Sequence, residues 1–382
     1  MRLAVYHAWI HCKGGGEKVL LELLENSEHD ITVFTNKYVP EDTYEEFEEY
    51  DVREIGGLPI VGEFLRGGLF TLGAMLTKLP LDDFDAFVVS TGGVAEAINF
   101  RNRSLPLIGF CHTPLRFLHD EDIVEYKKQE YGPLKRALYW FARKGYSMVE
   151  KPAWRLFDHV IFNSETTKQR ALEGGLIDEE RTSVDHPGAD TEGNEPGDYE
   201  HYFFYPSRFA YYKRQGLALD AYQEFRGRNP DTDFRLVVAG GVNEEKRPYF
   251  EEMKEKAAGI KGAEVRSNVP GDEWEELYRN CYSVLFTAIN EDWGIIPIEA
   301  GSYEKPIISV DEGGPRESII DGETGLLVDD TPGDIAGAME QLASDPERAR
   351  RMGKKGKQES RKYTWESFVK RFDDKVKEVA GG

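Results

Sequence analysis

Two glutamates near residue 300 enclose a glycine and a short apolar run, in the stretch Glu291-Asp292-Trp293-Gly294-Ile295-Ile296-Pro297-Ile298-Glu299. The strand-like residues 282–287 precede it, so the pattern predicts a strand, a loop and a helix. In a parallel sheet, Glu291 would lie at the end of the loop, near the crevice at the carboxyl ends of the strands. Glu299 would point toward the same crevice from the first turn of the helix.

This segment offers two kinds of binding group. Carboxylates accept hydrogen bonds from hydroxyls. The backbone N–H groups of Gly294, Ile295 and Ile296 would form a helix N-terminus, which suits a phosphate. An ordinary surface helix that is capped and carries acids near its start shows the same spacing, so spacing alone leaves both interpretations open.

The segment resembles the E-x-F-G-x-x-x-x-E-A pattern of the retaining glycosyltransferases of family 4. The resemblance implies that Glu291 lies against a donor sugar. It also implies that Glu299 holds the ribose hydroxyls of a nucleotide diphosphate sugar. Trp293 stands where that family usually has phenylalanine, and we place it with the donor-binding residues.

A second strand, loop and helix carries basic residues. The strand-like residues 201–206 precede Ser207, Arg208 and Lys213, and an apolar helix follows Gly216. This segment resembles the G-R-x-x-x-x-K-G motif of the same family, in which arginine and lysine neutralise the diphosphate. Arginine can bind two phosphate oxygens at once, whereas lysine supplies a compact charge. A solvated basic loop is the alternative.

The first half of the chain opens with a strand and a glycine-rich loop. Gly14, Gly15 and Gly16 precede a helix, and glycines there let the backbone approach a phosphate or a sugar. The spacing fits neither a Walker loop nor the G-x-G-x-x-G dinucleotide motif. The loop resembles the first loop of family 4 enzymes, which faces the donor, so we expect Gly15 and Gly16 to contact it. A structural turn is the alternative.

His112 follows a predicted strand at residues 107–110, in the string His112-Thr113-Pro114-Leu115-Arg116. This string is similar to one in bacterial and archaeal mannosyltransferases that build lipopolysaccharide and related glycans. The resemblance places His112 near the donor sugar and the reacting centre. A lone histidine can also have a purely structural role.

Length, charge and cysteine content limit the possibilities. A chain of 382 residues exceeds what one core usually serves, so two domains are expected. A net charge of −22 disfavours nucleic acid as a partner, because a phosphate backbone needs a basic footprint. We hypothesise a salt-adapted (halophilic) host, which activity lost in molar salt would contradict. Three scattered cysteines and the absence of a signal peptide favour the cytoplasm, and no metal site is expected.

The resemblance covers nearly the whole chain and implies an α/β protein with the GT-B fold. In this fold, two Rossmann-like, doubly wound domains face each other across a cleft. We expect an acceptor-side domain at 1–190 and a nucleotide-sugar-binding domain at 191–364. The C-terminal helix, 365–382, is expected to cross back to the first domain.

Two stretches could meet a membrane. Residues 58–79 are apolar and rich in glycine, but Glu63 and Arg66 interrupt them, so a spanning helix is not expected. Residues 126–151 mix basic and aromatic side chains, which would let a helix lie on an anionic bilayer. A helical hairpin that packs on the domain and exposes one solvated face is the alternative.

The sequence therefore predicts a cytoplasmic retaining glycosyltransferase that acts on a glycan or lipid-linked acceptor, with mannose as the expected sugar. The assigned catalytic residues are His112, Arg208, Lys213 and Glu291, and no cofactor or metal is required. A sugar nucleotide epimerase or a phosphorylase on the same scaffold remains an alternative. A noncatalytic nucleotide-sugar-binding protein is another. A dehydrogenase is disfavoured because the dinucleotide motif is absent.

Overall fold

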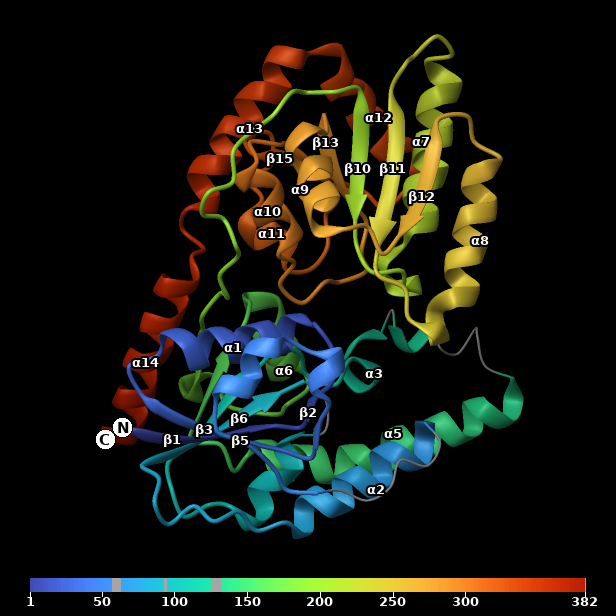
Figure 1. The fold of residues 1–382 in the computed structure, drawn as a ribbon. Helices are drawn as coiled ribbons and strands as arrows, with labels where there is room; N and C mark the ends of the chain where they lie inside the picture. Colours follow the sequence, from blue (N-terminus) through green and yellow to red (C-terminus); the bar gives the residue numbers. More distant parts are fainter. Residues whose placement is uncertain (57–62, 93–94, 122, 126–131, 382) are drawn as a thin grey trace. The chain divides into compact units, whose positions relative to one another are not determined.

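The computed structural model describes residues 1–56, 63–92, 95–121, 123–125 and 132–381. They form two units, Met1–Pro187 with Trp365–Gly382 and Gly188–Thr364 (Figure 1). The division lies three residues before the one expected at 190. The acidic stretch 191–198, which follows the expected boundary, packs on the second unit, where Asn194 donates to Ser302 Oγ over 2.8 Å. Parts of both stretches considered for membrane contact, 58–62 and 126–131, lie outside the described residues.

The first unit contains a seven-stranded parallel sheet in the order β5-β3-β1-β6-β7-β8-β9. Its strands are β1 Arg2–His7, β3 Asp30–Thr35, β5 Val52–Glu54, β6 Ala86–Thr91, β7 Leu107–Cys111, β8 His159–Phe162 and β9 Thr182–Val184. The short strands β2 Trp9–Ile10 and β4 Lys37–Tyr38 pair separately. Strand order reverses between β1 and β6, so the loops after these strands border a crevice of the kind that binds ligands in open α/β sheets.

Helices cover both faces of this sheet. Along β1, Leu3 and Val5 enter one apolar cluster while Ala4 and Tyr6 enter another, as expected for a strand that is buried on both sides. The helices are α1 Gly15–Asn26, α2 Glu63–Leu76, α3 Arg116–His119, α5 Pro133–Trp154, α6 Glu165–Glu173 and the 3₁₀ segment η3 Ala95–Arg101. Among the described helices of both units, none is long and apolar enough to cross a membrane.

The last helix, α14 Trp365–Gly381, belongs to the first unit although it ends the chain. Phe368 and Phe372 are fully buried there, and each ring packs in a T-shaped arrangement against the ring of Phe110 on β7. Asp373 accepts hydrogen bonds from Ser27 Oγ, at 2.7 Å, and from Glu28 N, at 3.0 Å. These contacts tie α14 to the end of α1.

The second unit repeats the architecture with six parallel strands in the order β12-β11-β10-β13-β14-β15. The strands are β10 Tyr202–Pro206, β11 Arg235–Gly240, β12 Ala263–Ser267, β13 Ser283–Phe286, β14 Ile307–Val310 and β15 Gly325–Val328. Its helices are α7 Gln215–Arg228, α8 Arg247–Ala258, α9 Gly271–Asn280, α10 Ile296–Ser302, α11 Pro315–Ser318, α12 Pro332–Ser344 and α13 Pro346–Ser360. Here the order reverses between β10 and β13, and the two motifs singled out from the sequence follow these two strands.

Candidate functional site

Lys213 and Glu291 form an ion pair at the reversal point of the second unit. Lys213 Nζ lies 2.7 Å from Glu291 Oε2, and their side chains are 10% and 21% exposed. Lys213 comes from the loop after β10 and Glu291 from the loop after β13. The structure therefore brings together two residues that the sequence placed 78 positions apart. A lysine held this way presents its charge at a fixed place.

Buried polar groups fix the relative position of these two loops. The hydroxyl of Tyr205 on β10 donates to the Lys213 carbonyl and accepts from Thr287 N at 3.2 Å. Thr287 Oγ1 in turn donates to Arg214 O at 2.9 Å. Neither Tyr205 nor Thr287 was singled out from the sequence. Their signal was weak, because a tyrosine inside a strand is usually read as a core residue.

Arg208 is held differently from Lys213. Its backbone carbonyl accepts from the buried Gln215 amide at 2.9 Å, and the same amide reaches Ser207 Oγ at 2.8 Å. No described residue accepts a hydrogen bond from the Arg208 guanidinium, and the side chain is exposed. Ser207, which departs from the expected glycine, thus takes part in holding the loop. The guanidinium remains available for a ligand.

Arg214 has a structural role that the sequence did not reveal. It adopts a left-handed conformation, with φ 51°, at the start of α7. Its guanidinium binds Glu312 at 3.0 Å, and Glu312 Oε2 also accepts from Asn290 N at 3.2 Å. Glu312 therefore links the loops that follow β10, β13 and β14.

Two glycines let the loop after β14 pack directly on the Glu291 loop. A Cβ on Gly313 would lie 2.5 Å from Glu291 O, and one on Gly314 would lie 2.5 Å from the carbonyls of Asp292 and Trp293. Gly314 N donates to Glu291 O at 2.7 Å. Any side chain at these positions would displace the backbone that carries Glu291.

The segment before α10 departs in detail from the expected helix N-terminus. The helix begins at Ile296, Ile295 is its N-cap, and Gly294 lies before it with φ +78°. Pro297 has no N–H to offer. The Trp293 side chain is only 6% exposed, and the centroid of its ring lies 5.2 Å from that of Tyr363. Trp293 therefore anchors the loop by packing inside the unit.

Glu299 lies in the first turn of α10, as expected, and has a partner that the sequence did not indicate. The buried Tyr278 hydroxyl on α9 donates to Glu299 Oε2 over 2.6 Å. Burial raises the pKa of Glu299 and Asp190 raises it further, whereas the Tyr278 hydrogen bond opposes the rise. The second carboxylate is thus positioned by a buried hydroxyl.

In the first unit, three strand ends meet around Ser90. Its hydroxyl lies 2.8 Å from His7 Nδ1 and 2.8 Å from His112 Nε2. Burial, with a smaller contribution from His7, lowers the pKa of His112 to about 3. His112 is therefore a neutral hydrogen-bonding group at neutral pH.

Gly15 and Gly16 were expected to precede a helix, but they form the first turn of α1, and only Gly14 lies before it as the N-cap. A Cβ on Gly15 would meet nothing within 4 Å, whereas one on Gly16 would lie 3.5 Å from His7 Cε1 and 3.7 Å from His112 Nε2. The glycine-rich loop thus borders the His112 cluster. The two histidines and this loop share the reversal point between β1 and β6.

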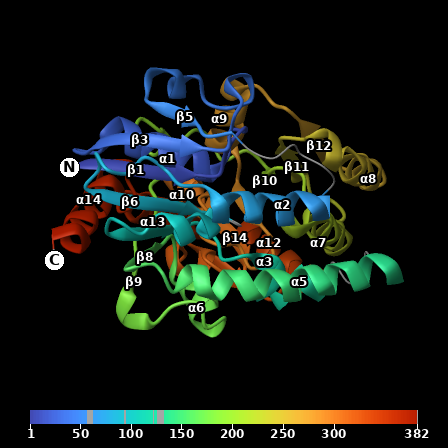
Figure 2. The same ribbon diagram turned by 90° about the horizontal axis from the view of Figure 1, so that it is seen from below.

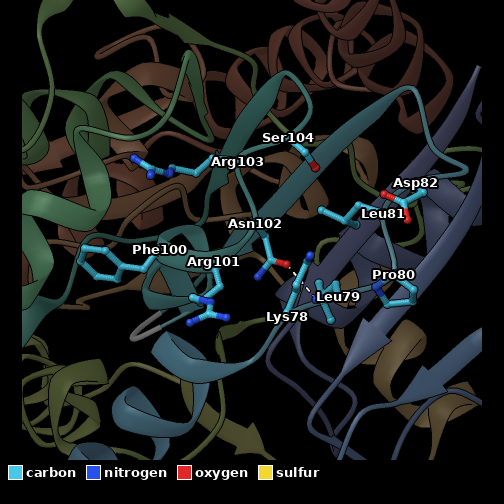
Figure 3. A pocket seen from close by; sticks show the side chains of 10 residues that line it. All are labelled: Lys78, Leu79, Pro80, Leu81, Asp82, Phe100, Arg101, Asn102, Arg103 and Ser104. Carbon is cyan, nitrogen blue, oxygen red and sulfur yellow. Dashed lines mark hydrogen bonds between the residues drawn. The ribbon is translucent and has the colours of Figure 1, made fainter.

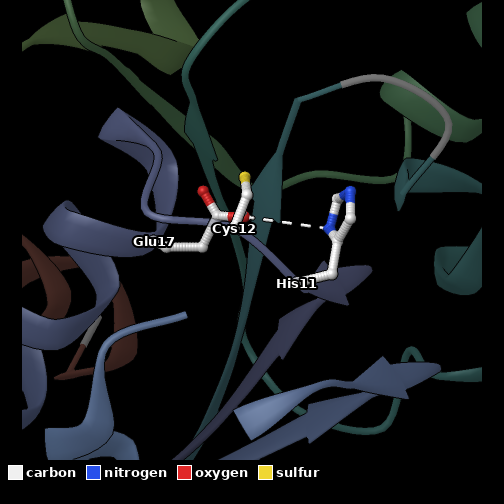
Figure 4. Close-up of side chains that lie close together, drawn as sticks. All are labelled: His11, Cys12 and Glu17. Carbon is white, nitrogen blue, oxygen red and sulfur yellow. Dashed lines mark hydrogen bonds and ion pairs between the residues drawn. The ribbon is translucent and has the colours of Figure 1, made fainter. Parts of the chain in front are cut away.

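A potential metal-binding group is shared by this loop and the first turn of α1 (Figure 4). His11, Cys12 and Glu17 have ligand atoms within 4.8 Å of one another. The thiol of Cys12 donates to Glu17 Oε1 at 3.1 Å, and His11 Nδ1 lies 4.0 Å from the same oxygen. The first contact is a hydrogen bond, whereas 4.0 Å is too long for one.

Two family models match the chain in succession. "Glycosyltransferase Family 4" matches residues 13–193, and "Glycosyl transferases group 1" matches residues 190–359. The second range contains Arg208, Lys213, Glu291 and Glu299, and the first contains Gly15, Gly16 and His112.

Curated relatives include alpha-1,3/1,6-mannosyltransferases named ALG2. The Mus musculus protein is 24% identical over 93% of this chain and 91% of its own length. The Dictyostelium discoideum protein is 31% identical over 47% of this chain, and the match spans only 46% of that relative.

Solved structures show the fold. Anabaena Alr3699/HepE in complex with UDP and glucose has a TM-score of 0.73 at 15% identity, with full coverage of both chains. The sucrose-phosphate synthase from Thermosynechococcus elongatus has a TM-score of 0.75 at 17% identity, covering 100% of this chain and 99% of its own. The GT-B fold expected from the sequence is confirmed.

Proposed function

Since the chain belongs to the glycosyltransferases of family 4, we propose that it moves mannose from a nucleotide diphosphate sugar to a glycan or lipid-linked acceptor, with retention. The ion pair of Lys213 and Glu291 at the reversal point of the second unit is the observation that supports this most. The names of the ALG2 relatives support mannose. The enzyme is a hexosyltransferase, and the identity of the hexose is part of the proposal.

The reaction breaks the bond between the sugar C1 and the diphosphate oxygen. Arg208 and Lys213 would offset the negative charge that develops on the leaving diphosphate, and one such donor is worth about 10²–10³ in rate. The acceptor hydroxyl forms the new bond to C1 on the same face. Its proton passes to the departing phosphate oxygen, so no protein nucleophile is needed.

Each remaining site residue has a proposed role in this reaction. Glu291 lies beside the sugar and fixes Lys213, and Glu299 binds the ribose hydroxyls. His112, neutral at neutral pH, would hydrogen-bond the sugar, and Gly15 and Gly16 would let the backbone approach it. The proposal includes no metal or other cofactor.

We place the reaction in the cytoplasm. No disulfide joins the three cysteines, all of which lie in the described part of the chain, and this supports a reducing compartment. Adaptation to high salt stays a proposal that rests on the net charge of −22.

A panel of sugar nucleotides tests the donor. We expect GDP-mannose to raise Tm most among GDP- and UDP-linked hexoses, because a ligand at about 100 times its Kd adds about 2.7 kcal/mol of stability. Products formed from labelled donor then separate transfer from epimerisation and from phosphorolysis. Indifference of the protein to every nucleoside diphosphate would remove the proposal. Binding without turnover on any acceptor would favour a noncatalytic binder.

Replacing Glu299 by glutamine separates its binding role from its effect on stability. Because its pKa is raised, the folded protein holds the proton more tightly than the unfolded chain, so stability falls as pH rises above the unfolded value. At neutral pH, E299Q should therefore raise Tm while it weakens donor binding about tenfold. The donor affinity of the wild type should also fall on acidification, whereas the donor affinity of E299Q should not change with pH.

Calorimetry from pH 5 to 8 measures both effects of E299Q. Glu275→Gln, an exposed change on α9, is the matched control. Donor affinity that is equal in wild type and E299Q at every pH would show that Glu299 does not bind the donor.

A further inference from the structure

Large apolar side chains on the surface of this protein are concentrated on two helices of the first unit. Ten are exposed in the described part of the chain, and seven of them lie on α2 and α5: Leu72, Leu76, Leu134, Leu138, Trp140, Phe141 and Met148. The two helices lie side by side (Figures 1 and 2). A contiguous exposed apolar surface of this kind marks a site of interaction with a partner or a membrane.

On α5 the exposed apolar residues form a stripe. Leu134, Leu138, Phe141 and Met148 are spaced by four, three and seven residues, so they lie along one line of the helix. They are 76%, 51%, 66% and 74% exposed. The opposite side of the helix packs on the unit through Tyr139, Glu150 and Trp154. The stripe therefore faces away from the core.

The charge of α5 is opposite to that of the whole protein. Between Pro133 and Trp154 there are five basic residues, Lys135, Arg136, Arg143, Lys144 and Lys151, against a single acid. That acid, Glu150, is buried and lies 2.8 Å from His119 Nε2. Among the described residues no acid pairs with Lys144 or Lys151, in a chain of net charge −22. The exposed charge beside the stripe is therefore positive.

A basic pocket lies at the end of α2 (Figure 3). It has a volume of about 590 Å³, and its lining includes Lys78, Arg101 and Arg103 against one acid, Asp82. No described acid pairs with these three cations. The pocket follows α2 directly and includes the end of η3, which packs against both α2 and α5. The pocket thus places positive charge next to the two helices, α2 and α5, that carry the exposed apolar residues.

We propose that the surface formed by α2 and α5 docks on an anionic lipid bilayer. The apolar stripe would enter the boundary between headgroups and acyl chains, and the basic residues would meet lipid phosphates, as in helices that lie in a membrane interface. The Trp140 ring, 54% exposed and 5.2 Å from Lys144 Nζ, suits this boundary. The excess negative charge elsewhere would keep other faces away from the bilayer. This surface is independent of the transferase chemistry proposed above.

Flotation of the full-length protein with vesicles tests the docking surface. We expect binding to phosphatidylcholine vesicles that contain 30% phosphatidylglycerol and little binding to pure phosphatidylcholine. The double variants W140S/F141S and K144E/K151E should each reduce binding at least about tenfold. R101E/R103E should reduce it as well if the pocket receives a lipid phosphate. Brominated lipids should quench the fluorescence of Trp140, so that W140F loses most of the quenching.

Two control variants belong to the second unit. I320S removes an exposed apolar residue, and K254E/R361E reverses two exposed charges, so both should bind vesicles as the wild type does. Tm and nucleotide binding should be unchanged in all variants, because the altered side chains are exposed. Equal vesicle binding by wild type and both α5 variants would overturn the proposal. So would a wild-type dimer that ignores vesicles and that W140S/F141S converts to a monomer.

Discussion

Replacing Arg208 by alanine should lower kcat/KM for the donor about 10²–10³-fold and leave Tm nearly unchanged. The reason is structural: the guanidinium is exposed and no described residue accepts a hydrogen bond from it, whereas the loop is held through the Arg208 carbonyl and Gln215. Loss of the side chain should therefore remove the charge that faces the diphosphate and little else. Steady-state kinetics and thermal unfolding measure the two quantities.

Two comparisons make the Arg208 result specific. Arg208→Lys keeps a charge but not the two-pronged geometry, so it should recover only part of the rate. Arg235→Ala removes another exposed arginine, at the opposite end of a neighbouring strand, and should behave as wild type. Unchanged turnover in R208A would take this residue out of the mechanism.

Replacing either member of the ion pair between Lys213 and Glu291 should lower both the catalytic rate and the folding stability. Lys213→Ala should lower kcat about 10²-fold or more, since it removes a positioned charge. It also leaves a partly buried carboxylate without its ion pair, so we expect a loss of about 2–4 kcal/mol of folding free energy. Glu291→Gln should be less severe for stability but should also lower kcat, because the lysine loses its fixed place.

The double variant K213A/E291Q distinguishes a coupled pair from two independent residues. If the ion pair acts as a unit, the effects on ln kcat and on unfolding free energy will be clearly less than additive. Denaturant titration and steady-state kinetics supply the four corners of the cycle. Strict additivity would mean that the 2.7 Å contact has no part in positioning Lys213.

Sequence patterns predicted the central strands well because these strands are buried on both faces. Residues 107–110 and 201–206 were expected as strands, and the structure has Leu107–Cys111 and Tyr202–Pro206. Residues 282–287 were expected as a strand, and the structure has Ser283–Phe286. Boundaries differ by one or two residues because caps and frayed turns decide them locally.

The site was only partly predictable. Glu291 and Lys213 were identified from a family resemblance, but the sequence could not show that they touch. Tyr205, Thr287 and Glu312 escaped notice because their importance comes from long-range hydrogen bonds that no local pattern encodes. Trp293 was placed with the donor, yet its ring lies inside the unit, because an aromatic residue next to a glycine turn fits a core as readily as a surface.

The helix α14 affects the order in which the protein can mature. Its residues Phe368 and Phe372 complete the apolar cluster of the first unit, yet the ribosome makes them after the whole of 188–364. Domains usually fold during synthesis with the N-terminal one first. Here the first unit cannot complete its folding until α14 is made, so part of its apolar interior stays exposed to water. The second unit, although it is encoded later, can complete its folding earlier. A fragment that stops at Pro187 would therefore keep that opening permanently and would tend to aggregate.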